Sequence, residues 1–208
     1  MRIRITFEKQ GALRYIGHLD LHKIWERSTR RANITLAYSQ GFHPMPKIQL
    51  ASALPLGFSS IAEVVDLFTV DDHDLVEFHD RLQNAVPSGI HIRNVEAVDS
   101  SVPPLQVQVT AARFQVQLGD ETSTVDDLAK VRQNLEGLLA RDEIWRERRG
   151  KQYDLRPLIE EASLGEDGKL DLRLSAREAA TGRPEEVLAE LGIAFENTDI
   201  ERTEIIFK

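Results

Sequence analysis

The chain has 208 residues, of which 41% are hydrophobic and 29% charged, and it contains no cysteine. This composition is typical of a folded protein of one or two domains and excludes wholesale disorder. The absence of cysteine excludes disulfides, thiolate zinc sites, cysteine nucleophiles and iron–sulfur clusters ligated by this chain.

Nothing in the sequence predicts a membrane span or a signal peptide. No segment approaches 18 consecutive apolar residues, and the N-terminal residues alternate like a strand. We therefore expect a cytoplasmic protein with no membrane partner.

Charge is unevenly distributed along the chain. The net charge is −8, yet residues 1–50 hold nine Lys or Arg against three acids, a balance of +6, so the remainder carries −14. Such asymmetry indicates an anionic partner, for example nucleic acid or a phosphorylated ligand. A mixed, solvated surface is the alternative.

The first half of the chain predicts the order βαββαβ, with extra extended structure in the middle. Alternation predicts a strand over residues 2–7, and the helical spacing of Leu21, Ile24 and Trp25 predicts a helix over about residues 18–31. Beyond these we expect extended segments at residues 35–38, 47–53 and 62–70, a helix at residues 72–84 and a strand at residues 91–98.

The second half repeats this order after a predicted linker at residues 99–105, where consecutive prolines favour neither helix nor sheet. The pattern predicts a strand at residues 106–118, a helix at 124–139 and two strands at 144–159 and 169–175. A helix that Arg183-Pro184 opens follows at residues 184–192, and the last strand is expected at 198–207. The sequence therefore predicts an α+β protein with two tandem ferredoxin-like (βαββαβ) domains, residues 1–98 and 106–208. That fold alone names no function.

The first helix carries a basic face that we expect to contact phosphate. Its members are Lys23, Arg27, Arg30 and Arg31. Arginine forks bind phosphate in a bidentate manner at little cost in reorganisation. The alternative is a solvated face, partly paired to Glu26 and other acids.

A second candidate site is the segment Tyr38-Ser-Gln-Gly-Phe-His-Pro-Met-Pro-Lys47, which we call the polar loop. Its prolines restrict the backbone, and Gly41 permits backbone angles that other residues avoid, so we expect the His43 and Lys47 side chains to be held in place. The expected substrate-binding residues are Tyr38, Ser39, Gln40, Phe42, His43 and Lys47. The aromatic rings could stack on a base, and His43 could donate a hydrogen bond or transfer a proton. Aromatic residues in the core and a solvent-facing histidine are the alternatives.

Metal binding and other catalytic classes have weaker support. His18, His22 and Glu26 share helical spacing, but this pattern arises often by chance, so we predict no metal site. There is no Gly-rich phosphate loop and no Gly-x-Ser-x-Gly elbow. His18 and His43 remain the candidate catalytic residues.

Several segments carry a family resemblance. They are Leu13-Arg-Tyr-Ile-Gly-His-Leu-Asp-Leu21, Arg30-Arg31, the polar loop, Leu54-Pro-Leu-Gly57, Asp154-Leu-Arg-Pro-Leu-Ile159 and Gly182-Arg-Pro-Glu-Glu-Val-Leu188. With them the chain resembles, over essentially its whole length, the radical-SAM-linked proteins, a bacterial family of unknown biochemical function. A weaker, architectural similarity runs to the repeat-associated RNA-binding proteins of CRISPR systems.

In the radical-SAM-linked family the domain is either fused behind a radical SAM domain or a separate polypeptide. Radical SAM chemistry needs an iron–sulfur cluster held by three cysteines, and this chain has none. The resemblance therefore implies an accessory protein without a cofactor of its own. A radical SAM enzyme in trans would carry the cluster and the S-adenosylmethionine.

We therefore expect an accessory protein that binds RNA or another phosphate-bearing substrate and presents it to a radical SAM enzyme, without catalysis of its own. One alternative is a metal-independent ribonuclease, or another enzyme, that uses His43 or His18. A second alternative is a protein-interaction module with no affinity for nucleic acid. The sequence leaves the oligomeric state open.

Overall fold

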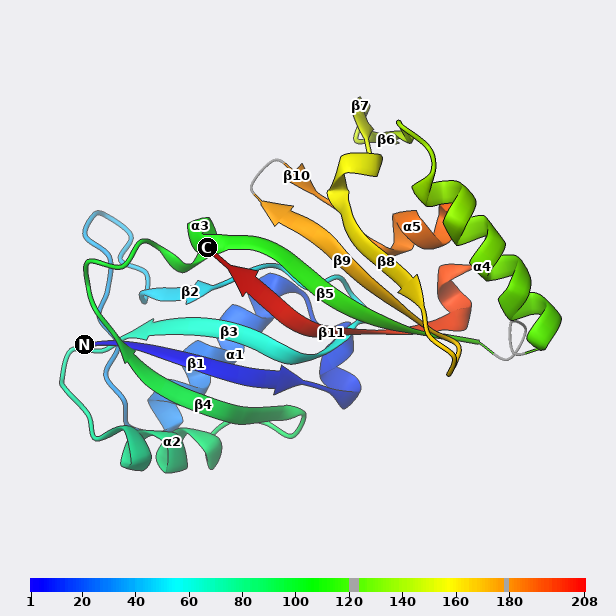
Figure 1. Ribbon diagram of the computed structural model, residues 1–208. Helices are drawn as coiled ribbons and strands as arrows, with labels where there is room; N and C mark the ends of the chain where they lie inside the picture. The colour runs from blue at the N-terminus through cyan, green and yellow to red at the C-terminus, as the bar shows by residue number, and fades with distance from the viewer. Residues whose placement is uncertain (120–123, 178–179) are drawn as a thin grey trace. The chain divides into compact units, whose positions relative to one another are not determined.

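The computed structural model describes residues 1–119, 124–177 and 180–208 (Figure 1). It divides the chain into two compact units, residues 1–109 with Lys208, and residues 110–207. Each unit combines helices with a β-sheet, so the protein is of mixed α and β class. Within the described residues no helix is long and apolar enough to cross a membrane.

The elements of the first unit follow the predicted order. They are β1 (Arg2–Lys9), η1 (Gly11–Tyr15), α1 (His18–Arg31), β2 (Ile48–Leu50), β3 (Ser59–Phe68), α2 (Leu75–Gln83), β4 (Ile90–Val98) and α3 (Leu105–Gln108). The predicted helix over residues 18–31 is confirmed with the same bounds. The helix expected over residues 72–84 begins later, because Asp74 caps it by accepting hydrogen bonds from the backbone N–H groups of Val76 and Glu77.

The sheet of the first unit has the strand order β2-β3-β1-β4, and these pairs are antiparallel. Alternation in β1 places Ile3, Ile5 and Phe7 on one face, where all three are fully buried. The helices α1 and α2 pack against this face through Trp25 and Phe78. The rings of Phe7 and Trp25 meet edge to face, with 4.8 Å between their centroids.

The opposite face of this sheet holds a buried ionic group. Asp66 is fully buried, and its carboxylate accepts hydrogen bonds from Arg2 at 2.6 and 2.9 Å and from Arg4 at 2.9 and 3.0 Å. Arg2 also donates to the carbonyls of Val102 and Pro103. Residues 99–105, which the sequence predicts to be a linker, are therefore held against the first unit.

The second unit has more elements than the sequence predicts. They are β5 (Val109–Leu118), α4 (Val125–Leu139), β6 (Trp145–Arg148), β7 (Lys151–Asp154), η3 (Arg156–Leu158), β8 (Ile159–Leu164), β9 (Lys169–Arg177), β10 (Ala180–Thr181), α5 (Pro184–Glu190), η4 (Phe195–Asn197) and β11 (Thr198–Phe207). The strand order is β10-β9-β5-β11, with β8 also paired to β9, while β6 and β7 form a separate two-stranded sheet. The last predicted strand is confirmed over residues 198–207.

The single strand expected over residues 144–159 is wrong. Arg149 and Gly150 both have positive φ, 54° and 75°, and reverse the chain between β6 and β7. Pro157 lies in the short helix η3, which separates β7 from β8. Likewise, the strand expected from residue 106 begins at Val109, because residues 105–108 form one helical turn.

Candidate functional site

The basic face of α1 points away from the core. The apolar side chains of α1 that face the sheet, Leu21 and Trp25, are buried, whereas all four cationic residues are exposed. The side chains of Arg27 and Arg30 make no hydrogen bond or ion pair with any residue that the structure describes. Lys23 lies 3.4 Å from an exposed carboxylate oxygen of Asp20, a pair that contributes little to stability.

Arg31 differs from the rest of the basic face because it serves the fold. Its Nε donates to the carbonyl of Ala85, just beyond the end of α2, at 3.0 Å, and its Nη2 donates to Ser28 Oγ at 3.1 Å. Part of its fork is thereby occupied by the protein, which leaves Arg27 and Arg30 as the stronger candidates for a ligand.

The end of α1 turns the chain back along the helix. Asn33 has φ of 52°, and the N–H groups of Asn33 and Ile34 donate to the carbonyls of Arg30 and Thr29. This is the Schellman arrangement, with asparagine in the left-handed position that glycine usually takes. It brings residues 33–38 beside the exposed face of α1.

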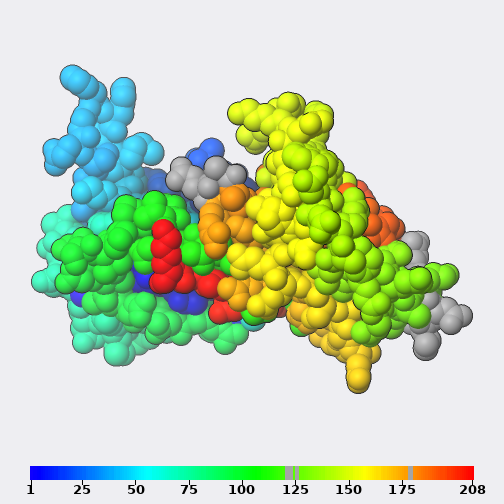
Figure 2. All heavy atoms as spheres, turned by 45° about the horizontal axis from the view of Figure 1, so that its top comes forward, coloured from blue at the N-terminus to red at the C-terminus, as the bar shows by residue number. Residues whose placement is uncertain are grey.

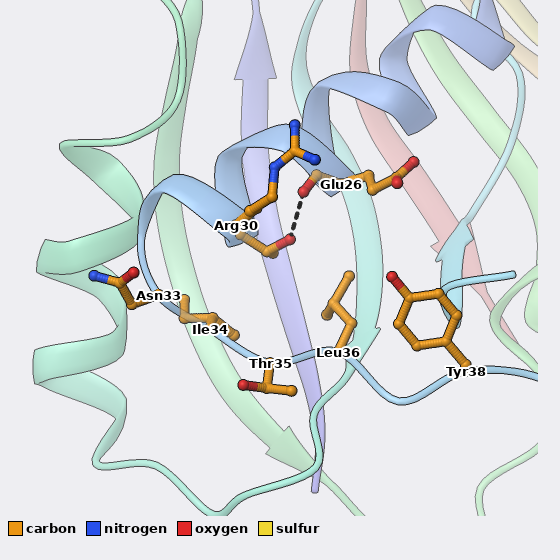
Figure 3. Close-up of a pocket in the computed structure, with 8 residues that line it drawn as sticks. Glu26, Arg30, Asn33, Ile34, Thr35, Leu36 and Tyr38 are labelled. Carbon is orange, nitrogen blue, oxygen red and sulfur yellow. Dashed lines mark hydrogen bonds between the residues drawn. The ribbon is translucent and has the colours of Figure 1, made fainter.

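A pocket of about 380 Å³, the α1 pocket, lies between the helix and this returning segment (Figure 3). Its lining residues are Glu26, Thr29, Arg30, Asn33, Ile34, Thr35, Leu36 and Tyr38. The Thr29 hydroxyl is already engaged, since it donates to the Glu26 carbonyl at 2.9 Å. The other polar groups of the pocket are available to a small polar ligand. They are the carboxylate of Glu26, the guanidinium of Arg30, the amide of Asn33 and the phenol of Tyr38.

The two ends of the polar loop are hydrogen-bonded to each other. Tyr38 bridges to Pro46, and the N–H of Ser39 donates to the Met45 carbonyl at 2.8 Å, while Ser39 Oγ accepts from the Met45 N–H at 3.0 Å. Gly41 has φ of 128°, which favours glycine. The loop projects from the surface, light blue in Figure 2.

Most predicted residues of the polar loop are accessible. Phe42 is fully exposed at 103%, Tyr38 is 52% exposed, and Gln40, His43 and Lys47 are also exposed, whereas Ser39 is half-buried. The alternative that these aromatic rings belong to the core is therefore wrong. The Lys47 side chain makes no hydrogen bond or ion pair within the described residues, although its backbone N–H donates to Ala37.

The structure brings together only part of the predicted site. Arg30 and Tyr38 line the α1 pocket, but neither His18 nor His43 does. His18 is the first residue of α1 and His43 lies in the polar loop. In the described part of the chain, no group of three or more His, Asp or Glu side chains could hold a metal ion.

Sequence reasoning missed a polar cluster in the second unit. Arg148 Nη2 lies 2.6 and 2.7 Å from the two carboxylate oxygens of Glu186, and its guanidinium lies 4.7 Å from the ring centroid of Tyr153. Burial, together with the Glu186 carboxylate, raises the pKa of Tyr153. No local pattern predicts this cluster, because Arg148 and Glu186 lie 38 residues apart.

The other large pockets are poorer anion sites. Two pockets of about 560 and 330 Å³ adjoin α4 and share Asn134, Leu191 and Gly192. Their cations have partners: Arg141 lies 2.8 Å from Glu190 and Lys130 lies 3.8 Å from Asp127. The exposed cations of α1 therefore remain the better candidate for binding phosphate.

Comparison with known proteins gives a family without a described activity. A family model described as "Uncharacterized protein conserved in bacteria (DUF2344)" matches residues 2–184. That description does not mention radical SAM enzymes. No curated protein matches the chain.

Among solved structures, the chain is similar to one described as "Crystal Structure of an Unknown Protein from Galdieria sulphuraria". The alignment covers 99% of this chain and 98% of the other, at 12% identity and a TM-score of 0.31. A TM-score this low supports no argument about fold or function.

Proposed function

The chain belongs to this family of uncharacterized bacterial proteins (DUF2344), and we propose that its first unit binds RNA through α1 and the polar loop. Phosphate groups of the RNA would contact Arg27, Arg30 and Lys47. Bases would stack on the exposed rings of Tyr38 and Phe42.

The observation that carries this proposal is that Arg27, Arg30 and Lys47, on one helix and the loop after it, have no side-chain partner among the residues that the structure describes. Many other arginines donate to carboxylates or carbonyls, among them Arg2, Arg4, Arg31, Arg81, Arg146, Arg148, Arg156 and Arg173. In a chain of net charge −8, acids are abundant. Arg27 and Arg30 nevertheless face solvent and pair with no acid in the described part of the chain, which suits an external anion.

The aromatic side chains favour RNA over a simple phosphate ligand. Single-stranded RNA is commonly bound by exposed aromatic rings that stack on bases, beside cations that contact the backbone. Tyr38 and Phe42 offer two such rings on the loop that follows α1. Exposing a large apolar ring such as Phe42 has no benefit for the stability of the fold.

We also propose a ferredoxin-like fold for each unit. In the first unit, the strand order β2-β3-β1-β4, with α1 and α2 packed against the sheet, supports a ferredoxin-like fold. The strand order β8-β9-β5-β11 around α4 and α5 supports it for the second. Two such units would suit an accessory RNA-binding protein, although the fold alone carries no function.

We further propose that a radical SAM enzyme is the partner in trans. The support is the resemblance of the segments at residues 13–21, 38–47 and 54–57 to radical-SAM-linked proteins. With no cysteine in this chain, the partner would supply the cluster and S-adenosylmethionine. The role of this protein would be to present the RNA.

The first test is binding of a fluorescein-labelled single-stranded RNA of about 20 nucleotides, followed by anisotropy over a range of salt concentrations. The logarithm of the binding constant should fall linearly with the logarithm of the salt concentration. Arg27→Gln, Arg30→Gln and Lys47→Gln should each weaken binding and reduce the salt slope by about 0.7 per lost phosphate contact. Lys130→Gln, the same charge change on an exposed residue of α4, is the matched control.

RNA binding that survives the three substitutions combined would refute the proposal. RNA cleavage without added metal, abolished by His43→Ala, would instead support the ribonuclease alternative. A pull-down of the tagged protein from its native cytosol, analysed for both RNA and protein, tests the partner. Recovery of a protein without RNA would favour an interaction module.

A further inference from the structure

The strands β6 and β7 form a ribbon that projects from the second unit, yellow to yellow-green in Figure 2. Trp145 pairs with Asp154 at its base and Arg148 with Lys151 at its end, so Arg149 and Gly150 alone make the turn. Both turn residues have positive φ, which identifies a type I′ turn. The tip of the ribbon is therefore the sequence Arg-Gly, followed by Lys151.

Side chains of the ribbon are anchored to the rest of the second unit. Arg146 lies 2.8 Å from Glu190 and Arg148 donates to Glu186, so two of its arginines are anchored on α5. At its base the Ile144 N–H donates to Asp154 Oδ1 at 2.7 Å. These contacts fix the strands before any ligand arrives, which reduces the entropy lost on binding.

Arg149 is an unfavourable choice for its backbone position. Type I′ turns strongly favour asparagine, aspartate or glycine, because the left-handed conformation crowds the Cβ of other residues. A side chain kept in such a conformation at an exposed tip indicates a role outside the fold. Consistent with this, Arg149 is exposed and its side chain has no partner among the described residues.

Two further features accompany Arg149. Lys151 is exposed and also lacks a side-chain partner in the part of the chain that the structure describes. Trp145 is 61% exposed, and its indole N–H donates to Glu143 at 2.9 Å, which restrains the ring. The acids within the two strands are Glu147 and Asp154, and both alternate to the face that carries Trp145, whereas Arg148 and Lys151 lie on the other face.

We infer that the β6–β7 ribbon is a second RNA contact, in which Arg149 and Lys151 at its tip bind backbone phosphates and Trp145 at the other end of β6 stacks on a nucleotide base. This inference rests on the proposed function, since it assigns a further site for the same ligand. Guanidinium forks match phosphate oxygens, and an indole ring stacks on any base. An acidic protein segment is the alternative partner for these cations, and polyglutamate serves below as the probe for it.

The sharpest test is Arg149→Asn, because asparagine is a preferred residue at this turn position. The variant should keep or raise the melting temperature while it weakens RNA affinity about three- to tenfold. Arg149→Lys keeps the charge and should lose less affinity. A loss of affinity in Arg149→Asn therefore cannot be attributed to unfolding.

A second measurement reads the ribbon directly. The protein has two tryptophans, and Trp25 is fully buried, so acrylamide quenching of fluorescence reports mainly on Trp145. Saturating RNA should protect Trp145 in the wild type. The variant carrying both Arg27→Gln and Arg30→Gln should need more RNA, yet reach the same protection.

The outcomes separate the two sites. Wild-type affinity in Arg149→Asn, without protection of Trp145, overturns the ribbon site and leaves the α1 site standing. Loss of affinity only in ribbon variants overturns the α1 site instead. If the wild type does not bind RNA, both sites are overturned. If polyglutamate protects Trp145 from quenching as well as RNA does, the assignment of RNA to the ribbon is overturned.

Discussion

Asp66 is the residue on which the charge balance of the first sheet depends. Its carboxylate is fully buried between the guanidinium groups of Arg2 and Arg4, which are themselves largely buried. Removing one partner from a buried ion pair leaves an uncompensated charge in a medium of low dielectric constant. The effect of a substitution here is therefore one of desolvation rather than of lost contact area.

We expect Asp66→Asn to lower the free energy of unfolding by about 3–5 kcal/mol, because the largely buried Arg2 and Arg4 both lose the charge of the carboxylate that they bind. Urea unfolding followed by circular dichroism measures the change. Asp20→Asn is the matched control: its carboxylate is well exposed beside Lys23, so the effect should stay within about 0.5 kcal/mol. Equal effects of the two substitutions would contradict this account.

Glu185 is a carboxylate whose burial works against folding at neutral pH. Burial raises the pKa of Glu185, Arg183 opposes this at 3.8 Å, and its Oε2 has no hydrogen-bond partner in the described residues. Since the folded-state pKa lies above the unfolded value, the folded state holds the proton more tightly. Stability is thus lost as pH rises from about 4.5, the unfolded pKa of the group, through the folded pKa.

We expect Glu185→Gln to raise the melting temperature at pH 7.5 more than at pH 4, because the amide avoids the cost of the buried charge. Thermal unfolding at both pH values tests this. Glu186→Gln, next in sequence, should instead lower the melting temperature at pH 7.5, because it removes the partner of Arg148. A gain for Glu185→Gln that does not depend on pH would show that the charge is not the cause.

At the scale of elements, two glycines illustrate opposite demands of the backbone. Gly89 precedes β4 with φ of 94°, and a Cβ there would lie 2.6 Å from the carbonyl oxygen of Gln10. Its own carbonyl accepts from the Gln10 N–H, so the two segments cannot separate freely. Gly137, inside α4, would place a Cβ in open space.

We expect Gly89→Ala to destabilise the protein by about 1–3 kcal/mol, through a strained φ and a clash with backbone. Gly137→Ala should stabilise it by about 0.5–1 kcal/mol, because alanine is the better helix former. Chemical denaturation of the pair, with the same change in side chain, isolates the backbone effect. A loss of stability in Gly137→Ala would contradict this explanation, which rests on helix propensity alone.

At the scale of the whole molecule, most exposed cations that have no side-chain partner among the described residues lie on α1, the polar loop and the β6–β7 ribbon. The net charge of −8 repels RNA from most of the surface, so binding should be confined to α1, the polar loop and the β6–β7 ribbon. Aromatic rings lie at two of these places, Phe42 in the loop and Trp145 in the ribbon. Both are suited to photochemical cross-linking with a stacked base.

We therefore expect ultraviolet cross-linking of RNA to the full chain to modify peptides that contain Phe42 and Trp145, as identified by mass spectrometry. Cross-links should decline with rising salt, because the phosphate contacts are screened. Peptides from residues 185–204, which are strongly acidic, serve as the internal control. Cross-links spread evenly over all peptides would argue against two discrete contacts.

The sequence by itself determined most of the elements. The helix α1 and the strand β11 have the predicted bounds, since helical and alternating periodicities are local properties of the chain. The basic face of α1 and the punctuated polar loop were also evident, because each lies within one short segment. Where local signals were weak, as in the Arg-Gly turn of the ribbon, the prediction was wrong.

Only the tertiary structure decided which of these residues act together. It assigned Arg31 to the carbonyl of Ala85, joined Arg30 and Tyr38 in one pocket, and paired Arg148 with Glu186. It also excluded His18 and His43 from that pocket. Such contacts depend on strand order, register and the angle at which the chain leaves a helix, and these arise from packing between segments distant in sequence rather than from the pattern within any one of them.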